Sequence, residues 1–355
     1  MYSILETKDP NIYRPLNISD NSSFTQGLTY GSWQRKMGRN VRNGIIKKDN
    51  EIIGTFQIIF YPLFGKKTYG YIPHGPILKQ EFDTDLALIF KSYLKDVCAE
   101  ENATFLRFDK YPFTKDCEIL DKSFTPSAHA SYYGAFFQYP YDWVTDISGT
   151  IDQIFEKMHE KTYYAVQASQ RRGAEVLCLS GAEMSEYFET FYELMEETSA
   201  RGAFHLHPKS YYKDIFDSAL NDKNILLFVA KYQGIVLATH LLIVHGKTIY
   251  YPYGASREIH RNILPTYAIH LAVIKEAKVR GCTGYNWGAI EHEDFPQKNW
   301  SGISSFKKRF GGDYFAYSPF YDHVSKPFWY WLYILRKKYR DRKNTNKTDS
   351  KIVEK

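Results

Sequence analysis

The sequence contains no apolar run long enough to cross a membrane. None of its apolar stretches reaches the roughly 18 uncharged residues from which a transmembrane helix is inferred. The first residues, MYSILETKDP, have neither the basic segment nor the apolar segment of a secretory signal. We therefore expect a cytoplasmic protein.

Cysteine is scarce, because the 355 residues include only four. They are scattered and form no C-x-x-C pair, which argues against a disulfide framework and a structural zinc site. Short groups of His and acidic residues occur in loops, where such groups are more often solvated than ligating. We expect no metal site and no cofactor.

The common catalytic motifs are also missing. The chain has no G-x-S-x-G, G-x-x-x-x-G-K-[ST], H-E-x-x-H or G-x-G-x-x-G sequence. The segment Gln170-Arg-Arg-Gly-Ala174 superficially suggests the phosphate loop of an acyl-CoA acetyltransferase. That loop should follow a strand, whereas this segment follows a helical pattern, so the signal is weak.

Positive charge is in excess only at the end of the chain. The net charge is +6, and residues 336–355 contain nine Lys or Arg and three acids. The other 335 residues therefore carry 37 charges of each sign. The tail could meet anionic lipid or RNA, although a solvated terminus is the simpler interpretation.

The most informative stretch is residues 225–288. Three apolar runs are separated by Gln233-Gly234 and Gly246-Lys247, which predicts two successive β-hairpins. Pro265 opens a helical pattern that Gly281 ends. A short strand near residues 283–287 would then complete an antiparallel meander crossed by one helix.

The same order of elements occurs earlier in the chain. Strands separated by turns at Asp49-Asn50 and Gly65-Lys66 precede a helix and a strand at residues 104–108. The spacing from Gly75 to Asp109 is 34 residues, and that from Gly254 to Asn286 is 32. We interpret this as a duplicated α+β unit.

The duplication predicts two domains. We expect domain 1 at residues 1–147, completed by residues 318–340, domain 2 at 148–317, and a disordered basic tail at 341–355. A final helix at residues 326–343 should pack an apolar stripe that includes Phe328 and Leu335 on domain 1. Only its cationic end, from Arg336 onward, would then be free for weak contact with the inner membrane surface or tRNA.

Several segments together resemble the FemABX family of peptidoglycan-bridge aminoacyltransferases. The resemblance covers roughly residues 24–335. It is carried by the segments FTQGLTYGSWQRKMG, YIPHGPIL, KTYYAVQASQRRGAEV, FYELMEETSARGAF, YYPYGAS with NILP downstream, and FKKRFGG. It implies two tandem acetyltransferase-like (GNAT-like) domains, each a mostly antiparallel sheet with packed helices. It also implies transfer of an amino acid from aminoacyl-tRNA to an amine of a cell-wall precursor's stem peptide.

The resemblance also implies site residues. The catalytic residues would be Lys307, near the reacting ester, and Asp109, as a base. The substrate-binding residues would be Lys36, His207, Tyr211, Tyr251 or Tyr253, and Phe306. The sequence departs from the family pattern where His207 and His74 replace an Arg, and where Tyr163 and Ala165 alter a Lys-Thr-Arg-x-Asn pattern. It has no room for a helical arm between residues 184 and 225, which predicts a compact member.

The implied chemistry needs no nucleophile motif, because a tRNA ester is already activated. Positioning the amine and stabilising the oxyanion would suffice. The implied partners are aminoacyl-tRNA and a UDP-linked or lipid-linked muramyl pentapeptide, acted on by a monomer. Two alternatives stay open: an N-acyltransferase of this fold that uses acyl-CoA or another donor, and a non-catalytic homologue that binds RNA or membrane.

Overall fold

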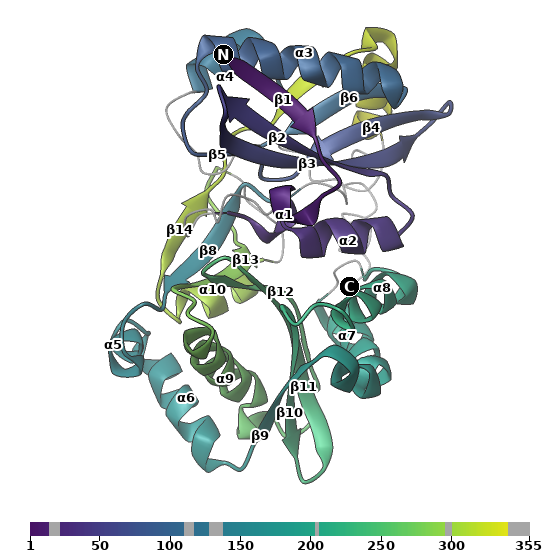
Figure 1. Ribbon diagram of the computed structural model, residues 1–355. Helices are drawn as coiled ribbons and strands as arrows, with labels where there is room; N and C mark the ends of the chain where they lie inside the picture. Colours follow the sequence, from purple (N-terminus) through teal and green to yellow (C-terminus); the bar gives the residue numbers. More distant parts are fainter. Residues whose placement is uncertain (14–21, 110–116, 128–137, 203–205, 295–299, 340–355) are drawn as a thin grey trace. The chain divides into compact units, whose positions relative to one another are not determined.

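The computed structural model describes residues 1–13, 22–109, 117–127, 138–202, 206–294 and 300–339 (Figure 1). The expected disordered tail, residues 341–355, lies outside the described residues. The chain forms two compact units. Unit 1 comprises Met1–Leu16, Arg39–Pro140 and Tyr317–Lys355, and unit 2 comprises Asn17–Gly38 and Tyr141–Ala316.

These units differ from the expected domains in two places. Strand β8 (Tyr141–Asp146), expected in domain 1, pairs with strands of the second sheet. Residues 17–38 also belong to unit 2, where Trp33 packs edge-on against Tyr211 with ring centroids 5.3 Å apart. Residues 17–38 are separated from the rest of unit 2 by residues 39–140, whereas β8 begins directly at the boundary between the two units.

The sheet of unit 1 has the order β1-β2-β3-β4-β6-β15-β7, with β5 beside β3. Its strands are β1 (Tyr2–Glu6), β2 (Val41–Lys48), β3 (Glu51–Leu63), β4 (Lys67–Ile72), β5 (Ile77–Leu78), β6 (Ala103–Phe108), β7 (Thr125–Pro126) and β15 (Tyr321–Val324). The turn residues Asp49, Gly65 and Lys66 have positive φ, as the expected hairpin turns require.

The sheet of unit 2 has the order β14-β8-β13-β12-β11-β10-β9. Besides β8 its strands are β9 (Glu175–Ser180), β10 (Ile225–Tyr232), β11 (Ile235–His245), β12 (Thr248–Ser256), β13 (Gly284–Ala289) and β14 (Asp313–Ala316). Gln233 and Gly234 have φ of 50° and 79°, which is typical of a type I′ hairpin turn. The two hairpins predicted from the sequence are present.

The helices join and cover these strands. In unit 1 they are α1 (Pro10–Tyr13), α3 (Thr84–Glu100), α4 (Cys117–Ser123) and a final helix at residues 327–339. In unit 2 they are α2 (Leu28–Lys36), α5 (Ile151–Glu156), α6 (Glu160–Arg171), α7 (Phe188–Gly202), α8 (Lys209–Ala219), α9 (Pro265–Val279) and α10 (Ser301–Lys308), with short 3₁₀ turns η1 (Phe24–Gln26), η2 (Gly181–Tyr187) and η3 (Arg261–Ile263). None of the helices in the described ranges is both long and apolar enough to cross a membrane.

The two sheets share one topology. In each, a hairpin pair is followed by a helix, and the next strand returns parallel to its predecessor: β4 beside β6 through α3, and β12 beside β13 through α9. The sequence had suggested an antiparallel return. A helical crossover brings the chain back to its starting end, so the following strand must run parallel.

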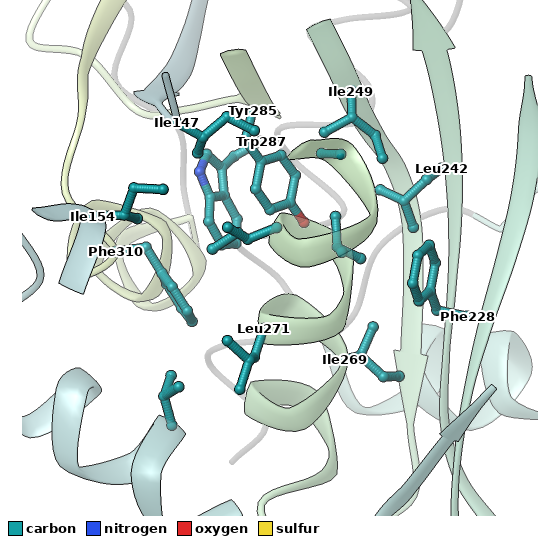
Figure 2. Packing of buried hydrophobic residues seen from close by; sticks show 14 of the residues in the cluster. Ile147, Ile154, Phe228, Leu242, Ile249, Ile269, Leu271, Tyr285, Trp287 and Phe310 are labelled. Atoms are coloured by element: carbon teal, nitrogen blue, oxygen red, sulfur yellow. The ribbon is translucent and has the colours of Figure 1, made fainter. Parts of the chain in front are cut away.

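The core of unit 2 lies between α9 and the sheet (Figure 2). Leu271 and Ile269 of α9 face the aromatic rings of Tyr285 and Trp287 and the aliphatic side chains of the sheet. Phe310 is fully buried against Trp287, with ring centroids 4.5 Å apart. This packing holds the segment after α10 against strand β13, which matters for the site below.

The final helix, residues 327–339, corrects one expectation. The expected inward stripe points outward, because Phe328, Trp331 and Leu335 are exposed. The packed face instead carries Tyr330 and Tyr333, which contact Phe105. A periodic stripe indicates an amphipathic helix but does not say which of two apolar faces is buried.

Candidate functional site

The parallel strands β12 and β13 part in the middle of the unit 2 sheet. Their pairing ends at Tyr250 and Asn286, and β12 then continues only beside β11 while β13 continues beside β8. Backbone groups of β13 beyond that point are therefore not used within the β12–β13 ladder. Gly288, which has a positive φ of 71°, lies in β13 just beyond this point.

Lys307 reaches this place from the last turn of α10. Its side chain is buried, and Nζ donates to the carbonyl oxygen of Ala289 over 2.7 Å. Burial lowers the pKa of Lys307 to about 8, while the charge of Asp142 acts in the opposite direction. An ammonium group is therefore still the main form at neutral pH, and it is held in a buried setting where its interaction with a negative charge would be strong.

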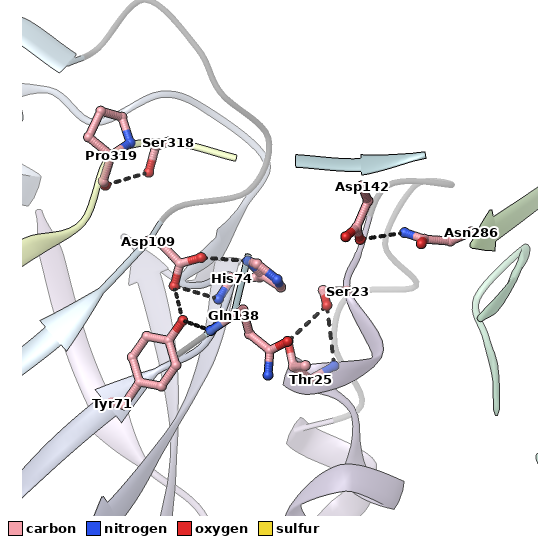
Figure 3. A network of polar contacts seen from close by, with 10 residues as sticks. All are labelled: Ser23, Thr25, Tyr71, His74, Asp109, Gln138, Asp142, Asn286, Ser318 and Pro319. Carbon is pink, nitrogen blue, oxygen red and sulfur yellow. Dashed lines mark hydrogen bonds and ion pairs between the residues drawn. The ribbon is translucent and has the colours of Figure 1, made fainter. Parts of the chain in front are cut away.

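Asp142 is fixed beside Lys307 by a buried amide. Asn286 Nδ2 donates to Asp142 Oδ2 over 2.8 Å (Figure 3). Asn286 Oδ1 accepts from the backbone N–H of Gly288 over 2.6 Å. The pair connects β8 with β13 and holds the backbone at Gly288, directly before Ala289. It therefore positions both the counter-charge and the carbonyl that Lys307 contacts.

Aromatic rings surround the lysine. The ring centroid of Phe306 lies 5.6 Å from the ring centroids of Tyr267 and His270. The ring centroids of Tyr251 and His270 are 5.1 Å apart. His270 is fully buried, and desolvation lowers its pKa well below the usual value, so the ring is neutral. The structure thus brings Lys307, Phe306 and Tyr251 into one cluster, which we call the lysine cluster.

A second cluster lies on the other face of the same sheet, between β12 and α8. The hydroxyl groups of Tyr211 and Tyr253 are 2.7 Å apart, and His207 stacks on Tyr211 with centroids at 4.1 Å. Burial raises the pKa of Tyr253 to about 12, so both phenols remain protonated hydrogen-bonding groups. Lys36 ends the neighbouring α2, is exposed, and interacts electrostatically with Asp214. We call these residues the tyrosine cluster.

The structure also separates Tyr251 from Tyr253, which the sequence left as alternatives. An irregularity in the β11–β12 register between Leu241 and Ile243 places Tyr253 toward α8 and Tyr251 toward α9. A methyl group at Gly254 would lie 1.7 Å from the Tyr251 hydroxyl oxygen, so only glycine leaves room for this ring. Tyr253 is thus the partner of Tyr211.

Asp109 belongs to unit 1. Its carboxylate is buried and accepts from Tyr71 Oη over 2.7 Å and from the backbone N–H of His74 over 3.0 Å (Figure 3). Its other oxygen faces His74 Nδ1, and the His74 ring stacks on Tyr317. Both oxygens are occupied, so these contacts favour a positioning role for Asp109 over direct proton transfer.

The basic segment Ser301–Gly312 contains three consecutive cations, Lys307, Lys308 and Arg309. It forms α10, which points Lys307 inward and leaves Lys308 and Arg309 exposed. Gly311 and Gly312 follow with positive φ, and a Cβ at Gly312 would lie 2.3 Å from the carbonyl oxygen of Val144. The glycines are required for close approach to β8, and the three cations do not form a single patch.

A polar cavity of about 480 Å³ lies beside α10. Its lining includes Ser301, Ser305, Lys308, Arg309 and His159. Within the described ranges, no three His, Cys, Asp or Glu side chains gather closely enough to hold a metal ion.

Sequence reasoning missed Asp142, Asn286 and His270. The strand register matches Asn286 to Arg107 of unit 1, because Tyr250 pairs with Asn286 as Tyr71 pairs with Arg107. No sequence pattern pointed to Asp142 or His270. Asp142 contacts Asn286, which is 144 residues away in the chain, and His270 contacts Tyr285, which is 15 residues away on another element. Only the folded chain identifies them.

This architecture defines the class of protein. Residues 157–299 match the family described as acetyltransferase (GNAT) domain. Two sheets of mostly antiparallel strands with packed helices, one of them carrying that domain, confirm the expected tandem fold and an acyltransferase.

The similar proteins are more specific. The chain is 22% identical to the lipid II:glycine glycyltransferase of Staphylococcus saprophyticus, over 75% of this chain and 79% of that protein. It is 22% identical to the enzyme of the same name from Staphylococcus aureus, over 82% and 85%. The resemblance expected from the sequence motifs is thus confirmed.

Solved structures agree on the fold. FemX superposes with a TM-score of 0.77 at 19% identity, covering 93% of this chain and 99% of that one. A tandem GNAT protein from the clavulanic acid biosynthesis pathway gives a TM-score of 0.51 at 8% identity, with 92% and 99% covered.

Proposed function

We propose that the protein transfers an amino acid from aminoacyl-tRNA to an amine on the stem peptide of a peptidoglycan precursor. This proposal rests mainly on the buried Lys307, which lies where the pairing of β12 with β13 ends. The near full-length similarity to proteins named lipid II:glycine glycyltransferase supports this choice over other acyl transfers.

In this proposal Lys307 stabilises the oxyanion that forms when the amine attacks the ester carbonyl. One such contact is worth roughly two to three orders of magnitude in rate. Phe306 and Tyr251 line the same site and exclude water. Asp142 and Asn286 keep the lysine and the Ala289 carbonyl in place.

The tyrosine cluster is the proposed binding site for the acceptor. Lys36 supplies a cation for a phosphate of the precursor, and His207, Tyr211 and Tyr253 supply stacking and hydrogen-bonding groups. Asp109 is proposed to act through His74, since its own oxygens are already occupied.

The test is a transfer assay with two acceptors. The protein is incubated with a mixture of charged tRNAs and either a UDP-linked muramyl pentapeptide or lipid II in detergent, and the products are analysed by mass spectrometry. Glycyl-tRNA is tested first, because the similar proteins are named glycyltransferases. We expect a mass increase of one amino-acid residue on at least one acceptor.

Two controls make the assay decisive. Lys307→Ala should slow product formation by about two orders of magnitude, while Lys308→Ala, on the exposed side of the same helix, should leave it unchanged. A product formed only when acetyl-CoA or another acyl-CoA replaces the charged tRNA would instead identify an N-acyltransferase. No product with any donor would contradict an enzymatic role.

A further inference from the structure

The final helix, residues 327–339, turns four large apolar side chains toward solvent. Phe328, Trp331, Leu335 and Tyr339 are exposed by 64%, 55%, 42% and 72%. At 3.6 residues per turn these positions fall within an arc of about 80° and extend over about 16 Å. They form one continuous surface, which we call the aromatic stripe.

The orientation of this helix is fixed by the packing of its opposite face. Tyr330 and Tyr333 lie 5.2 and 4.9 Å from Phe105, measured between ring centroids. Trp329 packs on Phe64 at 5.8 Å and fills the space over Gly65, where a Cβ would lie 2.7 Å from its ring. The helix could not rotate to bury the aromatic stripe without exposing this larger set of contacts.

Cations flank the aromatic stripe. Arg336 and Lys338 project on either side of it by helical geometry, and Arg336 is held over Phe64 at 4.1 Å. Past these residues the sequence continues with the basic tail, and residues 336–355 carry the whole net charge of +6. Aromatic and cationic groups therefore alternate along one edge of unit 1.

A further pair of cations lies at the start of the helix. Lys67 Nζ and Lys326 Nζ donate to the same oxygen, Asn102 Oδ1, over 3.1 and 2.5 Å. Lys67 Nζ is also 5.5 Å from the ring of Trp329, the neighbour of Phe328. Two ammonium groups that share one neutral oxygen repel each other, and an anionic group beside them would relieve that repulsion.

We propose that the aromatic stripe and its flanking cations dock unit 1 onto the surface of a bilayer that contains anionic lipids. Aromatic side chains are favoured at the level of lipid headgroups, and cations are attracted to an anionic surface. A two-fold pairing of two copies through this face would bring like charges together. The docking goes beyond the proposed function and does not depend on it.

The test is binding to vesicles made of equal parts of phosphatidylglycerol and phosphatidylcholine, measured by flotation at low and high salt. The full chain should float with these vesicles and much less with phosphatidylcholine alone. The double variant Phe328→Ser/Trp331→Ser should bind the vesicles at least about tenfold more weakly, because these two side chains would make the main apolar contacts with the bilayer. High salt should weaken the binding of the native protein, because cations contribute to it.

A matched control is available on the same protein. Leu88→Ser/Tyr164→Ser removes two side chains of similar exposure from α3 and α6, and should leave vesicle binding unchanged. Circular dichroism checks that both double variants are folded. If the helix variant binds as tightly as the native protein, the proposal is wrong.

Other outcomes would also overturn it. A concentration-dependent dimer that the helix variant abolishes, without vesicle binding by the native protein, would assign the face to a second copy. Equal binding of the native protein to neutral and anionic vesicles would remove the role of the cations. Transfer to a soluble UDP-linked acceptor should be the same in the native protein and the helix variant, so failure of docking and failure of the proposed function are distinguishable.

Discussion

Arg107 and Asp322 form a buried bidentate ion pair that joins β6 to β15. Nε and Nη2 of the guanidinium each lie 2.7 Å from one carboxylate oxygen, and both side chains are almost completely buried. In unit 2 the matching strands, β13 and β8, are joined by Asn286 and Asp142. Each sheet thus places a carboxylate of its sixth strand against a hydrogen-bond donor on the fifth.

The ion pair predicts a large loss of stability on truncation. Asp322→Ala leaves the Arg107 charge buried without its partner and removes the acceptor of the Tyr330 hydroxyl. We expect a loss of about 3–5 kcal/mol in the free energy of unfolding, measured by urea denaturation. Glu118→Ala, which breaks an exposed pair with Lys122, should cost about 0.5 kcal/mol or less. Similar losses in both variants would contradict the importance of the buried pair.

The activity should depend on the charge of Lys307. Because its pKa is about 8, the rate of transfer should fall as pH rises through this value and the ammonium group is lost. Lys307→Ala should lower single-turnover rates by about two orders of magnitude while the fold is kept. A pH profile that is flat between 7 and 9, corrected for donor hydrolysis, would be inconsistent with this role.

The lowered pKa of Lys307 also predicts how the free energy of unfolding depends on pH. Between pH 8 and 10.5 the unfolded state binds more protons than the folded state at this lysine, so stability should rise with pH across that window. Lys307→Met should remove this rise and stabilise the protein at pH 7 by about 1–3 kcal/mol. Thermal unfolding of both proteins at several pH values measures the effect, and identical pH dependence would contradict it.

The two tyrosines of β12 should differ in their roles. Tyr253→Phe breaks the hydrogen bond with Tyr211 and should weaken acceptor binding about threefold to tenfold, with little change in the rate at saturation. Tyr251 lies in the lysine cluster, so Tyr251→Phe should instead change the rate at a saturating concentration of acceptor. Titration of the acceptor at fixed donor separates KM from kcat for each variant. The opposite pattern would exchange the two assignments.

The role of Asp109 can be tested through His74. If Asp109 positions His74, then Asp109→Asn and His74→Asn should lower activity by similar factors, and the double variant should be little worse than either single variant. If Asp109 accepts the proton directly, Asp109→Asn alone should be far more damaging. Single-turnover rates of the three variants decide between these outcomes.

Much of the fold could be predicted from the sequence, because its signals are local. Paired glycine-containing breaks gave the hairpins, and Pro265 and Gly281 marked the ends of a helix. The duplication followed from the matching order and spacing of these elements, without any knowledge of long-range contacts.

The features that could not be predicted depend on interactions between distant residues, which leave no local pattern in the sequence. The irregularity in β12 sends Tyr251 and Tyr253 to opposite faces, although a regular strand would place them on the same one. Lys307 and Lys308 are adjacent lysines that only the family resemblance distinguishes in the sequence, and the fold buries Lys307 and exposes Lys308. The final helix has two apolar faces. It buries the face with Tyr330 and Tyr333, which packs on Phe105 of β6.

The sixth strand of unit 1 has a consequence for synthesis on the ribosome. Strand β15 is encoded after all of unit 2, so β6 has no neighbour on that side until residues 321–324 emerge. During translation unit 1 therefore exposes an open sheet edge and an uncompensated Arg107 for the time needed to make about 200 further residues, some tens of seconds. A nascent chain stalled before residue 321 should be a substrate for chaperones that bind unpaired strands.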